Sequence, residues 1–260
     1  MYATERHELI THLLREEGRV SVVDLASRFA VTTETVRRDL ALLEEDGMLR
    51  RVHGGAVAAG RSSTVETPVA ERLLRHGDAK RAIGVRALDA LEPGFHGSIY
   101  LDAGTTTAAV AAALPAHLLR SGATAEVVTH SMTIAHGLAG TDLGLTVIGG
   151  RVRGLTAAAV GAETVGTIRT LRPDVAFIGT NGVSGAFGLS TPDPDEAAVK
   201  AAIISAARRV IVVADAEKFG AELLVRFAGL SDVDVLVADA APPSALTTSL
   251  SDAGAELWLA

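Results

Sequence analysis

Two pairs of arginines near the start of the chain have the residue type and spacing needed to bind a nucleic acid. Arg37 and Arg38 are adjacent, and Arg50 and Arg51 follow just before the glycine pair at positions 54 and 55. An arginine side chain can pair with guanine O6 and N7 in the major groove, and it also binds phosphate. These arginines therefore predict contact with double-stranded DNA. The alternative is a solvated helix face that happens to carry arginines.

Arg37 and Arg38 lie within a segment, residues 32–46, that has the spacing of an amphipathic helix. Its buried face is expected to consist of Val36, Leu40 and Leu43. Arg38 then lies on the opposite face and is predicted to read bases, whereas Arg37 lies to one side and is predicted to bind phosphate. Asp39 lies on the other flank, where we expect it to orient an arginine rather than to touch DNA.

Three helices and a hairpin are expected to position these arginines. Residues 4–17 have helical spacing, and the next helix begins at Ser21, which has Asp24 three residues later as in a capping box. Residues 48–57 are expected to form a hairpin, so that residues 1–57 make a winged helix-turn-helix. His53 would contact phosphate or only close the hairpin. The residues predicted to contact DNA are Ser21, Thr32, Thr33, Glu34, Thr35, Arg37, Arg38, Arg50, Arg51, His53 and Gly54.

The segment Asp-Ala-Gly-Thr-Thr-Thr at residues 102–107 has the composition of a phosphate-binding helix start. It follows an apolar run and opens an alanine-rich helix, and Gly104 allows a tight turn between the two. Hydroxyl groups and the free N–H groups of a helix start suit an anionic phosphate group. A capped helix start with additional threonines is the alternative.

From residue 97 onward, short apolar runs alternate with segments long enough for crossover helices. The runs cover residues 98–101, 126–129, 145–148, 174–178, 210–214, 233–237 and 256–259. Such nearly continuous hydrophobic runs are typical of parallel strands buried on both faces. The pattern predicts an α/β domain with a mainly parallel sheet, which binds its ligand beyond the carboxyl ends of the strands. Residues 58–67 are expected to be a linker, residues 68–91 to be helical, and residues 68–260 to form this effector domain.

Polar side chains follow several of the apolar runs, and we expect them to meet in one crevice. The residues predicted to bind an effector are Asp102, Gly104, Thr105, Thr106, Thr107, His130, Ser131, Gly179, Asn181, Gly182, Lys200, Asp215 and Lys218. All but three of the 24 basic residues are arginine, so Lys200 and Lys218 are unusual in this chain. Either these two positions require the compact charge of an ammonium group, or the two lysines remain by chance in a composition that favours arginine.

The composition limits the possible classes of protein. A net charge of −7 argues against a strong nucleic-acid partner, so a local basic surface should need several copies of the chain to bind DNA well. We therefore expect a homo-oligomer, a dimer or tetramer. The absence of cysteine excludes disulfides and thiolate metal sites, and no metal or cofactor is expected. Neither a signal sequence nor a membrane span is recognisable, which predicts a cytoplasmic protein without a membrane partner.

Residues 3–58 resemble the DNA-binding domain of the DeoR family of bacterial transcription regulators. The resemblance rests above all on Thr35-Val36-Arg37-Arg38-Asp39-Leu40 and His53-Gly54-Gly55-Ala56. It extends to the family's effector domain through the 102–107 segment, Lys80-Arg81-Ala82-Ile83-Gly84, Glu196 with Lys200, and Asp215 with Lys218-Phe219-Gly220. The resemblance implies a fold similar to ribose-5-phosphate isomerase and glucosamine-6-phosphate deaminase, and a phosphorylated sugar as effector.

The same resemblance implies roles for individual residues. Gly104 to Thr107 and Lys218 would hold the phosphate, while Asp102, Asn181 and Lys200 would face the sugar. The chain departs from the family at His130, where asparagine is usual. Similarity of residues 178–191 to fructose-operon regulators suggests fructose 1-phosphate, and the family implies a repressor released by its sugar.

Two classes of function compete, a sugar-phosphate-gated regulator and a sugar-phosphate isomerase or deaminase with a DNA-binding head. The related isomerases carry an Asp-Gly-Ala-Asp string where this chain has Gly179-Thr180-Asn181-Gly182, and they carry a catalytic glutamate where it has Lys200. Glu196 lies nearby in what is expected to be a proline-containing loop. The resemblance therefore implies a sensor and not an enzyme. A DNA-binding protein without any effector is a third alternative.

Overall fold

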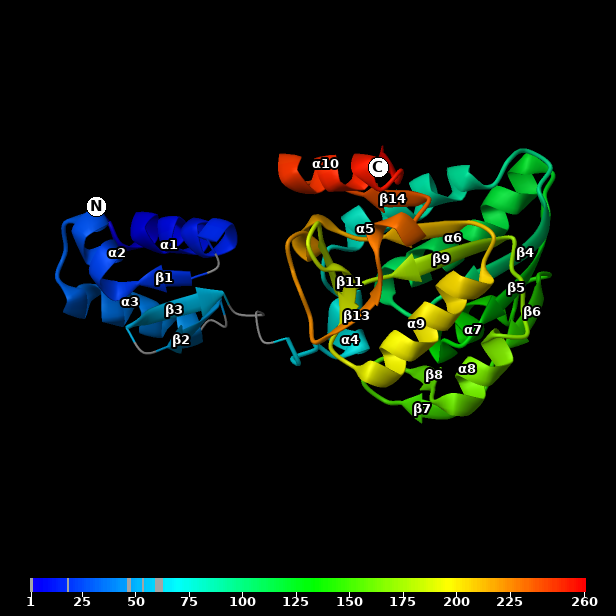
Figure 1. Cartoon of the computed structure of the whole chain (residues 1–260), viewed down its shortest axis with the longest axis horizontal. Helices are drawn as coiled ribbons and strands as arrows, with labels where there is room; N and C mark the ends of the chain where they lie inside the picture. The colour runs from blue at the N-terminus through cyan, green and yellow to red at the C-terminus, as the bar shows by residue number, and fades with distance from the viewer. Residues whose placement is uncertain (1, 18, 46–47, 53, 59–62) are drawn as a thin grey trace. The chain divides into compact units, whose positions relative to one another are not determined.

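The chain forms two compact units, Met1–Val65 and Glu66–Ala260, here called the first and the second unit (Figure 1). The computed structural model describes residues 2–17, 19–45, 48–52, 54–58 and 63–260. Glu66 and Thr67, which the sequence analysis places in the linker, lie in the second unit.

The first unit consists of three helices and a small antiparallel sheet. The helices are α1 (Ala3–Glu17), α2 (Val22–Phe29) and α3 (Thr33–Glu45), and the strands are β1 (Arg19–Ser21), β2 (Leu49–Val52) and β3 (Gly55–Ala58), in the order β1-β3-β2. Apolar residues of all three helices form one core with Val20, Leu49 and Ala56 of the strands. These elements are a winged helix-turn-helix, as the sequence predicts.

Strand β1 is the element of this unit that the sequence analysis missed. It is only three residues long and exists because it pairs with β3, with Val20 opposite Ala56 and Ser21 opposite Gly55. A Cβ atom on Gly55 would lie 2.0 Å from the carbonyl oxygen of Val20, so glycine is required for this close approach. Ser21 also caps α2, because its hydroxyl accepts the backbone N–H of Val23 at 3.2 Å.

The second unit is built on one parallel sheet, and every apolar run predicted from the sequence supplies a strand of it. The strands are β4 (His96–Leu101), β5 (Thr124–Thr129), β6 (Gly144–Val147), β9 (Val175–Gly179), β12 (Val210–Val213), β14 (Val235–Ala238) and β15 (Glu256–Leu259). Their order is β15-β14-β12-β9-β4-β5-β6, and every neighbouring pair is parallel. The carboxyl ends therefore share one edge of the sheet.

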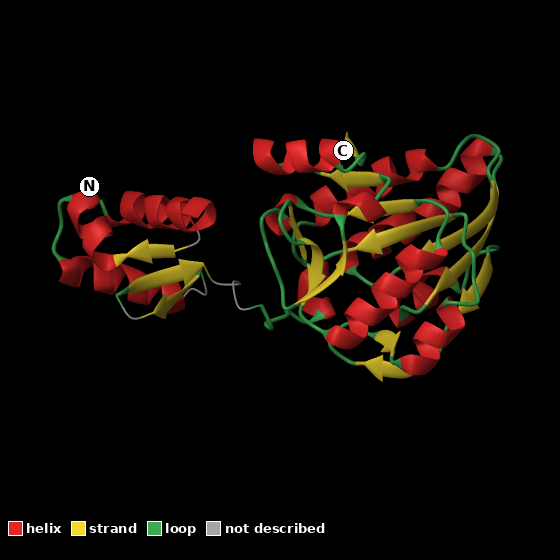
Figure 2. Ribbon diagram, in the orientation of Figure 1, coloured by secondary structure: helices red, strands yellow, loops and turns green. Residues whose placement is uncertain are grey.

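Helices cover both faces of this sheet (Figure 2). One face packs against α5 (Gly77–Ala87), α6 (Thr105–Ser121) and α7 (Met132–Leu138), and the other against α8 (Ala162–Ile168), α9 (Pro194–Ala206) and α10 (Ser244–Asp252). Ile99 and Leu101 point to the first layer and Tyr100 to the second, which explains why the strands are hydrophobic throughout. No described helix has the length and apolar character to cross a membrane.

Several short elements of the second unit have no clear signal in the sequence. They are β7 (Arg151–Arg153) with β8 (Ala158–Val160), a second antiparallel sheet of β10 (Gly182–Ser184), β11 (Gly188–Thr191) and β13 (Val225–Ala228), and the 3-10 turns Leu88–Ala90, Ala216–Lys218 and Leu230–Asp232. Strands of three residues contain too few positions for periodicity to reveal them, and β11 and β13 are not continuous apolar runs.

The segment at residues 68–91 differs from the expected continuous helix. It consists of α4 (Val69–Leu73) and α5, with a break at His76, which has a left-handed backbone (φ 53°). The buried ammonium group of Lys80 stabilises the break, since it donates to the carbonyl oxygens of Arg72 and Arg75 at 2.6 and 2.7 Å. The turn between α4 and α5 lies at the pocket described below.

Candidate functional site

Helix α3 presents its arginines to solvent. Val36, Leu40 and Leu43 are buried, and Arg37 and Arg38 are exposed, as the helical wheel predicts. Arg37 lies 3.4 Å from the exposed carboxylate of Glu34, while the guanidinium of Arg38 has no ion pair within the described residues. Thr32 caps the helix, because its hydroxyl accepts the backbone N–H of Thr35 at 3.2 Å. Thr32, Thr33 and Glu34 are exposed, and Thr35 is half-buried.

Asp39 is a buried polar residue of α3, and its carboxylate contacts residues of α1. Its Oδ2 accepts a hydrogen bond from Arg6 Nε at 2.7 Å and its Oδ1 accepts one from Arg6 Nη2 at 3.0 Å, and His7 Nε2 lies 3.1 Å from the same Oδ1. Both Arg6 and Asp39 are buried. Asp39 thus orients an arginine, as expected, but that arginine comes from α1 and ties α1 to α3.

The wing carries the remaining residues predicted to contact DNA. Arg51 and Gly54 are exposed, and the backbone N–H of Arg51 donates to Glu44 Oε1 at 2.7 Å. Glu44 therefore links α3 to β2. Ser21 is half-buried and is used as the cap of α2. The side chain of Arg50 and all of His53 lie outside the described residues.

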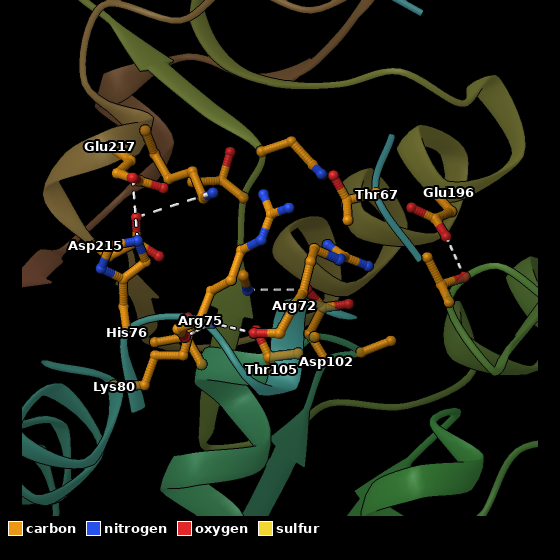
Figure 3. Close-up of a pocket in the computed structure, with 18 of the residues that line it drawn as sticks. Thr67, Arg72, Arg75, His76, Lys80, Asp102, Thr105, Glu196, Asp215 and Glu217 are labelled. Carbon is orange, nitrogen blue, oxygen red and sulfur yellow. Dashed lines mark hydrogen bonds and ion pairs between the residues drawn. The ribbon is translucent and has the colours of Figure 1, made fainter. Parts of the chain in front are cut away.

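A polar cavity opens at the carboxyl edge of the large sheet in the second unit (Figure 3). Residues that directly follow β4, β5, β9 and β12 line it, together with the turn between α4 and α5 and the start of α9. The lining residues are Thr67, Arg72, Arg75, His76, Lys80, Asp102, Ala103, Gly104, Thr105, Thr106, His130, Thr156, Gly179, Thr180, Asn181, Glu196, Lys200, Asp215, Glu217 and Lys218.

Most residues predicted to bind an effector line this cavity, but Thr107, Ser131 and Gly182 do not. The hydroxyl of Thr107 turns back to the carbonyl of Gly104 at 2.9 Å, and that of Ser131 caps α7 by accepting the N–H of Ile134 at 3.3 Å. Gly182 is paired in β10, where an added Cβ would lie 2.3 Å from a backbone oxygen. All three thus have structural roles outside the cavity lining, and their contact with an effector stays a prediction.

Positive charge gathers at one end of the cavity, at the start of α6. Gly104, with φ of +150°, opens this helix, and the Thr105 and Thr106 backbone forms its first turn. Lys218 and Lys80 come from other elements, and Arg72, Arg75 and His76 from the turn after α4. Burial lowers the pKa of Lys80, the charge of Asp215 opposes the shift, and nearby Lys218 and Arg72 add to it. Asp215 and Glu217 also line this end, where they lie near Lys218 and His76. A helix start with several cations nearby suits an anion.

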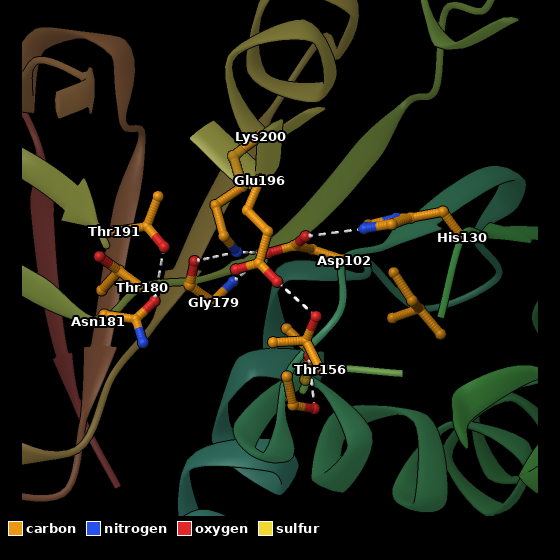
Figure 4. A network of polar contacts seen from close by, with 12 residues as sticks. Asp102, His130, Thr156, Gly179, Thr180, Asn181, Thr191, Glu196 and Lys200 are labelled. Carbon is orange, nitrogen blue, oxygen red and sulfur yellow. Dashed lines mark hydrogen bonds and ion pairs between the residues drawn. The ribbon is translucent and has the colours of Figure 1, made fainter. Parts of the chain in front are cut away.

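A buried network of Asp102, Lys200 and Gly179 forms the floor of the cavity (Figure 4). Lys200 Nζ donates to Asp102 Oδ2 at 2.5 Å and to the Gly179 carbonyl at 2.9 Å, and the Gly179 N–H donates to the same carboxylate oxygen at 2.9 Å. Within the described residues, Asp102 Oδ1 is buried without a hydrogen-bond partner, and His130 Nε2 is 3.7 Å away. This oxygen is free to accept a hydrogen bond from a hydroxyl group of a ligand.

The ring of His130 is held between Asp102 and Tyr100. Its Nδ1 lies 3.0 Å from the Tyr100 hydroxyl, and the imidazole is almost wholly buried. Burial lowers the pKa of His130 to about 4, although the charge of Asp102 opposes the shift. Burial also raises the pKa of Tyr100, so the phenol stays protonated. His130 is therefore neutral near pH 7.

The stability of the second unit should fall as the pH is lowered from about 6.5 to about 4. The unfolded chain binds a proton on His130 in this range while the folded chain does not, so folding loses free energy. The pKa difference corresponds to about 3 kcal/mol for the complete titration. Urea unfolding, followed by Trp258 fluorescence and repeated across this pH range, measures how the free energy of unfolding changes with pH. The variant His130→Asn should lack this pH dependence. Parallel pH profiles for the two proteins would contradict this account.

Four charged side chains form a second network beside the floor. Arg153 Nη1 donates hydrogen bonds to two carboxylates, to Glu66 Oε2 at 2.7 Å and to Glu196 Oε1 at 3.1 Å. Arg153 Nε also donates to Asp193 at 3.0 Å. Burial raises the pKa of Glu196, and the charge of Glu66 adds to the shift. Glu196 lies in the first turn of α9 and not in a loop, because Asp193 and Pro194 start the helix there.

The residues that line the cavity include Arg72, Arg75, His76, Thr156 and Glu217, which are not among those predicted from the sequence to bind an effector. For Arg72, Arg75 and His76 a signal was available in Gly77, which directly follows them. A glycine at the end of a helical segment often marks a turn. Thr156 and Glu217 reach the cavity from a turn and a 3-10 element that have no sequence signature.

Two family descriptions match this chain. A "DeoR-like helix-turn-helix domain" matches residues 6–61, and a "DeoR C terminal sensor domain" matches residues 75–240. The chain is 34% identical over 240 residues to the "Uncharacterized HTH-type transcriptional regulator FruR" of Bacillus subtilis (strain 168), with 92% of each chain covered. It is 32% identical over 260 residues to the glycerol-3-phosphate regulon repressor of Escherichia coli (strain K12), with all of each chain covered.

Similarity to solved structures is much lower. A ribose 5-phosphate isomerase A from Methanocaldococcus jannaschii is 16% identical, with 55% of this chain and 54% of that chain covered and a TM-score of 0.41. No conclusion about activity follows from a likeness of this size. The matches to the winged helix and to the sensor domain decide the identity, and this chain belongs to the DeoR family of DNA-binding transcription regulators.

Proposed function

We propose that this protein is a cytoplasmic repressor of sugar-catabolism genes whose affinity for operator DNA changes when a phosphorylated sugar binds in the cavity of the second unit. The observation that carries the proposal is the division of the cavity into a cationic end and a polar floor. Cations surround the start of α6 at one end, and Asp102 offers an unused acceptor at the other. That arrangement suits a ligand with one anionic group and several hydroxyl groups.

The roles of the lining residues follow from their positions. Gly104, Thr105, Thr106 and Lys218 hold the phosphate at the start of α6, and we add Arg72 and Arg75 to this group. The floor residues Asp102 and Lys200, with Asn181 beside them, receive the sugar hydroxyls. His130 stays neutral and limits the space next to Asp102.

The names of relatives suggest two candidate effectors. One relative is named FruR, which is in keeping with fructose 1-phosphate, and another is named a glycerol-3-phosphate regulon repressor. We propose fructose 1-phosphate, and glycerol 3-phosphate is the first alternative to test.

Thermal unfolding with a panel of sugar phosphates tests the proposal. A specific effector present at a hundred times its dissociation constant should stabilise the second unit by about 2.7 kcal/mol. Lys218→Ala should lose this stabilisation while binding DNA as the wild type does, because Lys218 lies in the second unit. If no sugar phosphate shifts the transition, the protein has no effector of this class. Loss of DNA binding as well would mean that Lys218 is structural.

DNA recognition is expected to depend differently on the two arginines of α3. Arg38→Ala should cost about 1–3 kcal/mol of binding free energy and relax sequence preference, because Arg38 faces the bases. Arg37→Ala should weaken all sites alike and reduce the salt dependence, because it contacts phosphate. Binding to DNA selected from a random library by the wild-type protein measures both. Equal loss without any change of preference would contradict the assignment.

The acidity of the chain supports a homo-oligomer, a dimer or tetramer, as the form that binds DNA. One winged helix neutralises few phosphates, so several copies are needed for useful affinity. Analytical ultracentrifugation with and without the effector tests this proposal.

A sugar-phosphate isomerase is the second candidate, and one observation favours it. Glu196 is a buried carboxyl group at the cavity whose pKa is raised, as is common for a general base. Its oxygen is engaged by Arg153 and Thr156, which favours a structural role. Turnover of ribose 5-phosphate, glucosamine 6-phosphate or a fructose phosphate that disappears in Glu196→Gln would establish catalysis.

A further inference from the structure

Glu66 is the residue with which the second unit begins, and its carboxylate is held inside this unit. It directly follows Val65, the last residue of the first unit, and its side chain is only 2% exposed. The carboxylate lies 3.3 Å from Arg72 Nη2, accepts Arg153 Nη1 at 2.7 Å and accepts Asn181 Nδ2 at 3.3 Å. Three side chains thus hold the start of the unit in place.

Two of these partners also line the effector cavity, Arg72 and Asn181. The Nε of Arg72 is buried and has no hydrogen-bond partner within the described residues. An anionic ligand at the start of α6 would satisfy this donor, and it would attract the guanidinium that Glu66 now holds. Glu66 and such a ligand therefore require the same cation.

The third partner of Glu66 cannot replace Arg72. Arg153 is shared with Asp193 and Glu196, so three carboxyl groups, including that of Glu66, already surround it. The negative charge of Glu66 already contributes to the raised pKa of Glu196, which is a measure of this crowding. A buried carboxylate that loses one of its cations is strongly destabilised.

We propose that Glu66 competes with the anionic group of the effector for Arg72. Effector binding breaks the Glu66–Arg72 ion pair while the effector keeps Arg72 at the cavity, and the segment at residues 66–69, which precedes Arg72, is released from the second unit. This inference rests on the proposed function, and it supplies the step by which an occupied cavity alters the chain that leads to the DNA-binding unit. Binding of the effector and retention of Glu66 are then reciprocally coupled.

Hydrogen–deuterium exchange of the full-length wild type tests the release without any substitution. The probes are fructose 1-phosphate, glycerol 3-phosphate and inorganic phosphate. Amide exchange in residues 66–69 should become about threefold faster or more with a probe that binds, since the Val69 N–H donates to the Leu155 carbonyl in the held state, while exchange at the start of α6 slows. Slower exchange in residues 66–69 would overturn the proposal, because it would mean that the ligand tightens the segment.

Calorimetric titration of the same probes into Glu66→Gln tests the competition. The amide keeps the shape of Glu66 but lacks its charge, so the probe should bind about tenfold tighter, within the usual range of coupling between linked sites. Glu71→Gln is the matched control, because Glu71 is exposed on α4, carries the same charge and does not line the cavity. It should bind like the wild type.

The outcomes separate this inference from the proposed function. If a probe binds the wild type and Glu66→Gln equally and exchange in residues 66–69 is unchanged, the competition is wrong and the sugar-phosphate sensor stands. If no probe binds the wild type or either variant, the proposed function fails, and the competition fails with it. Trp258 fluorescence confirms that each variant is folded, since the only tryptophan lies in the second unit.

Discussion

Lys200→Met should lower the free energy of unfolding of the second unit by about 3–5 kcal/mol. Lys200 and Asp102 form a buried ion pair in which the side chains are 6% and 0% exposed. Without the ammonium group, Asp102 keeps a buried charge that only the Gly179 N–H stabilises directly. Urea unfolding followed by Trp258 fluorescence measures the loss, and the response to sugar phosphates should disappear as well.

Lys218→Met is the matched control for this experiment. Lys218 also lines the cavity, but its side chain is 28% exposed and lies 3.8 Å from Asp215. Partly exposed ion pairs contribute about 0–1 kcal/mol, so this variant should unfold at nearly the wild-type urea concentration. A similar loss of stability in both variants would mean that burial of the Lys200–Asp102 pair is not what makes it important.

Asp39→Ala should destabilise the first unit by about 3–5 kcal/mol, because the buried guanidinium of Arg6 loses the carboxylate that accepts hydrogen bonds from its Nε and Nη2. DNA binding should be lost although Asp39 does not face DNA. The transition seen by Trp258 should not change, because that residue belongs to the second unit. Far-UV circular dichroism, which reports both units, measures the additional transition of the first.

The pKa of Asp39 gives this prediction a pH dependence. Burial alone would raise the pKa, but the hydrogen bonds from Arg6 and His7 outweigh burial and lower it below 3.8. The stabilisation is therefore complete above the unfolded pKa and is lost as the pH falls through the folded one. Glu34→Ala is the control for stability, since Glu34 and Arg37 form an ion pair whose side chains are 78% and 58% exposed. A variant Asp39→Ala that still binds DNA at wild-type strength would show that this pair is dispensable.

Much of the fold could be predicted because its signals are local in the chain. Apolar runs of at least four residues predicted all seven strands of the large sheet, and spacing in residues 32–46 predicted which face of α3 is buried. Caps such as Ser21 are equally local, since donor and acceptor lie within three residues. The strand ends also predicted most of the cavity, because parallel strands bring their carboxyl ends to one edge.

Other parts of the site could not be predicted because they depend on contacts between distant residues. The break at His76 is stabilised by Lys80, and it brings Arg72 and Arg75 to the cavity. Glu66 reads as a polar linker residue, yet it is buried by Arg153, which is 87 positions away. Short strands such as β7 and β10 exist only through their partners.

The sequence alone determined the two-part architecture, the exposed arginines of α3 and the polar strand ends of the second unit, because each follows from the order of apolar and polar residues along a helix or strand. Tertiary structure decided which charges meet. It pairs Asp39 with Arg6, leaves one oxygen of Asp102 unused, and places Arg72 between Glu66 and the cavity. The free energy of a charge depends on burial and on neighbours from other elements, and only the folded chain supplies both.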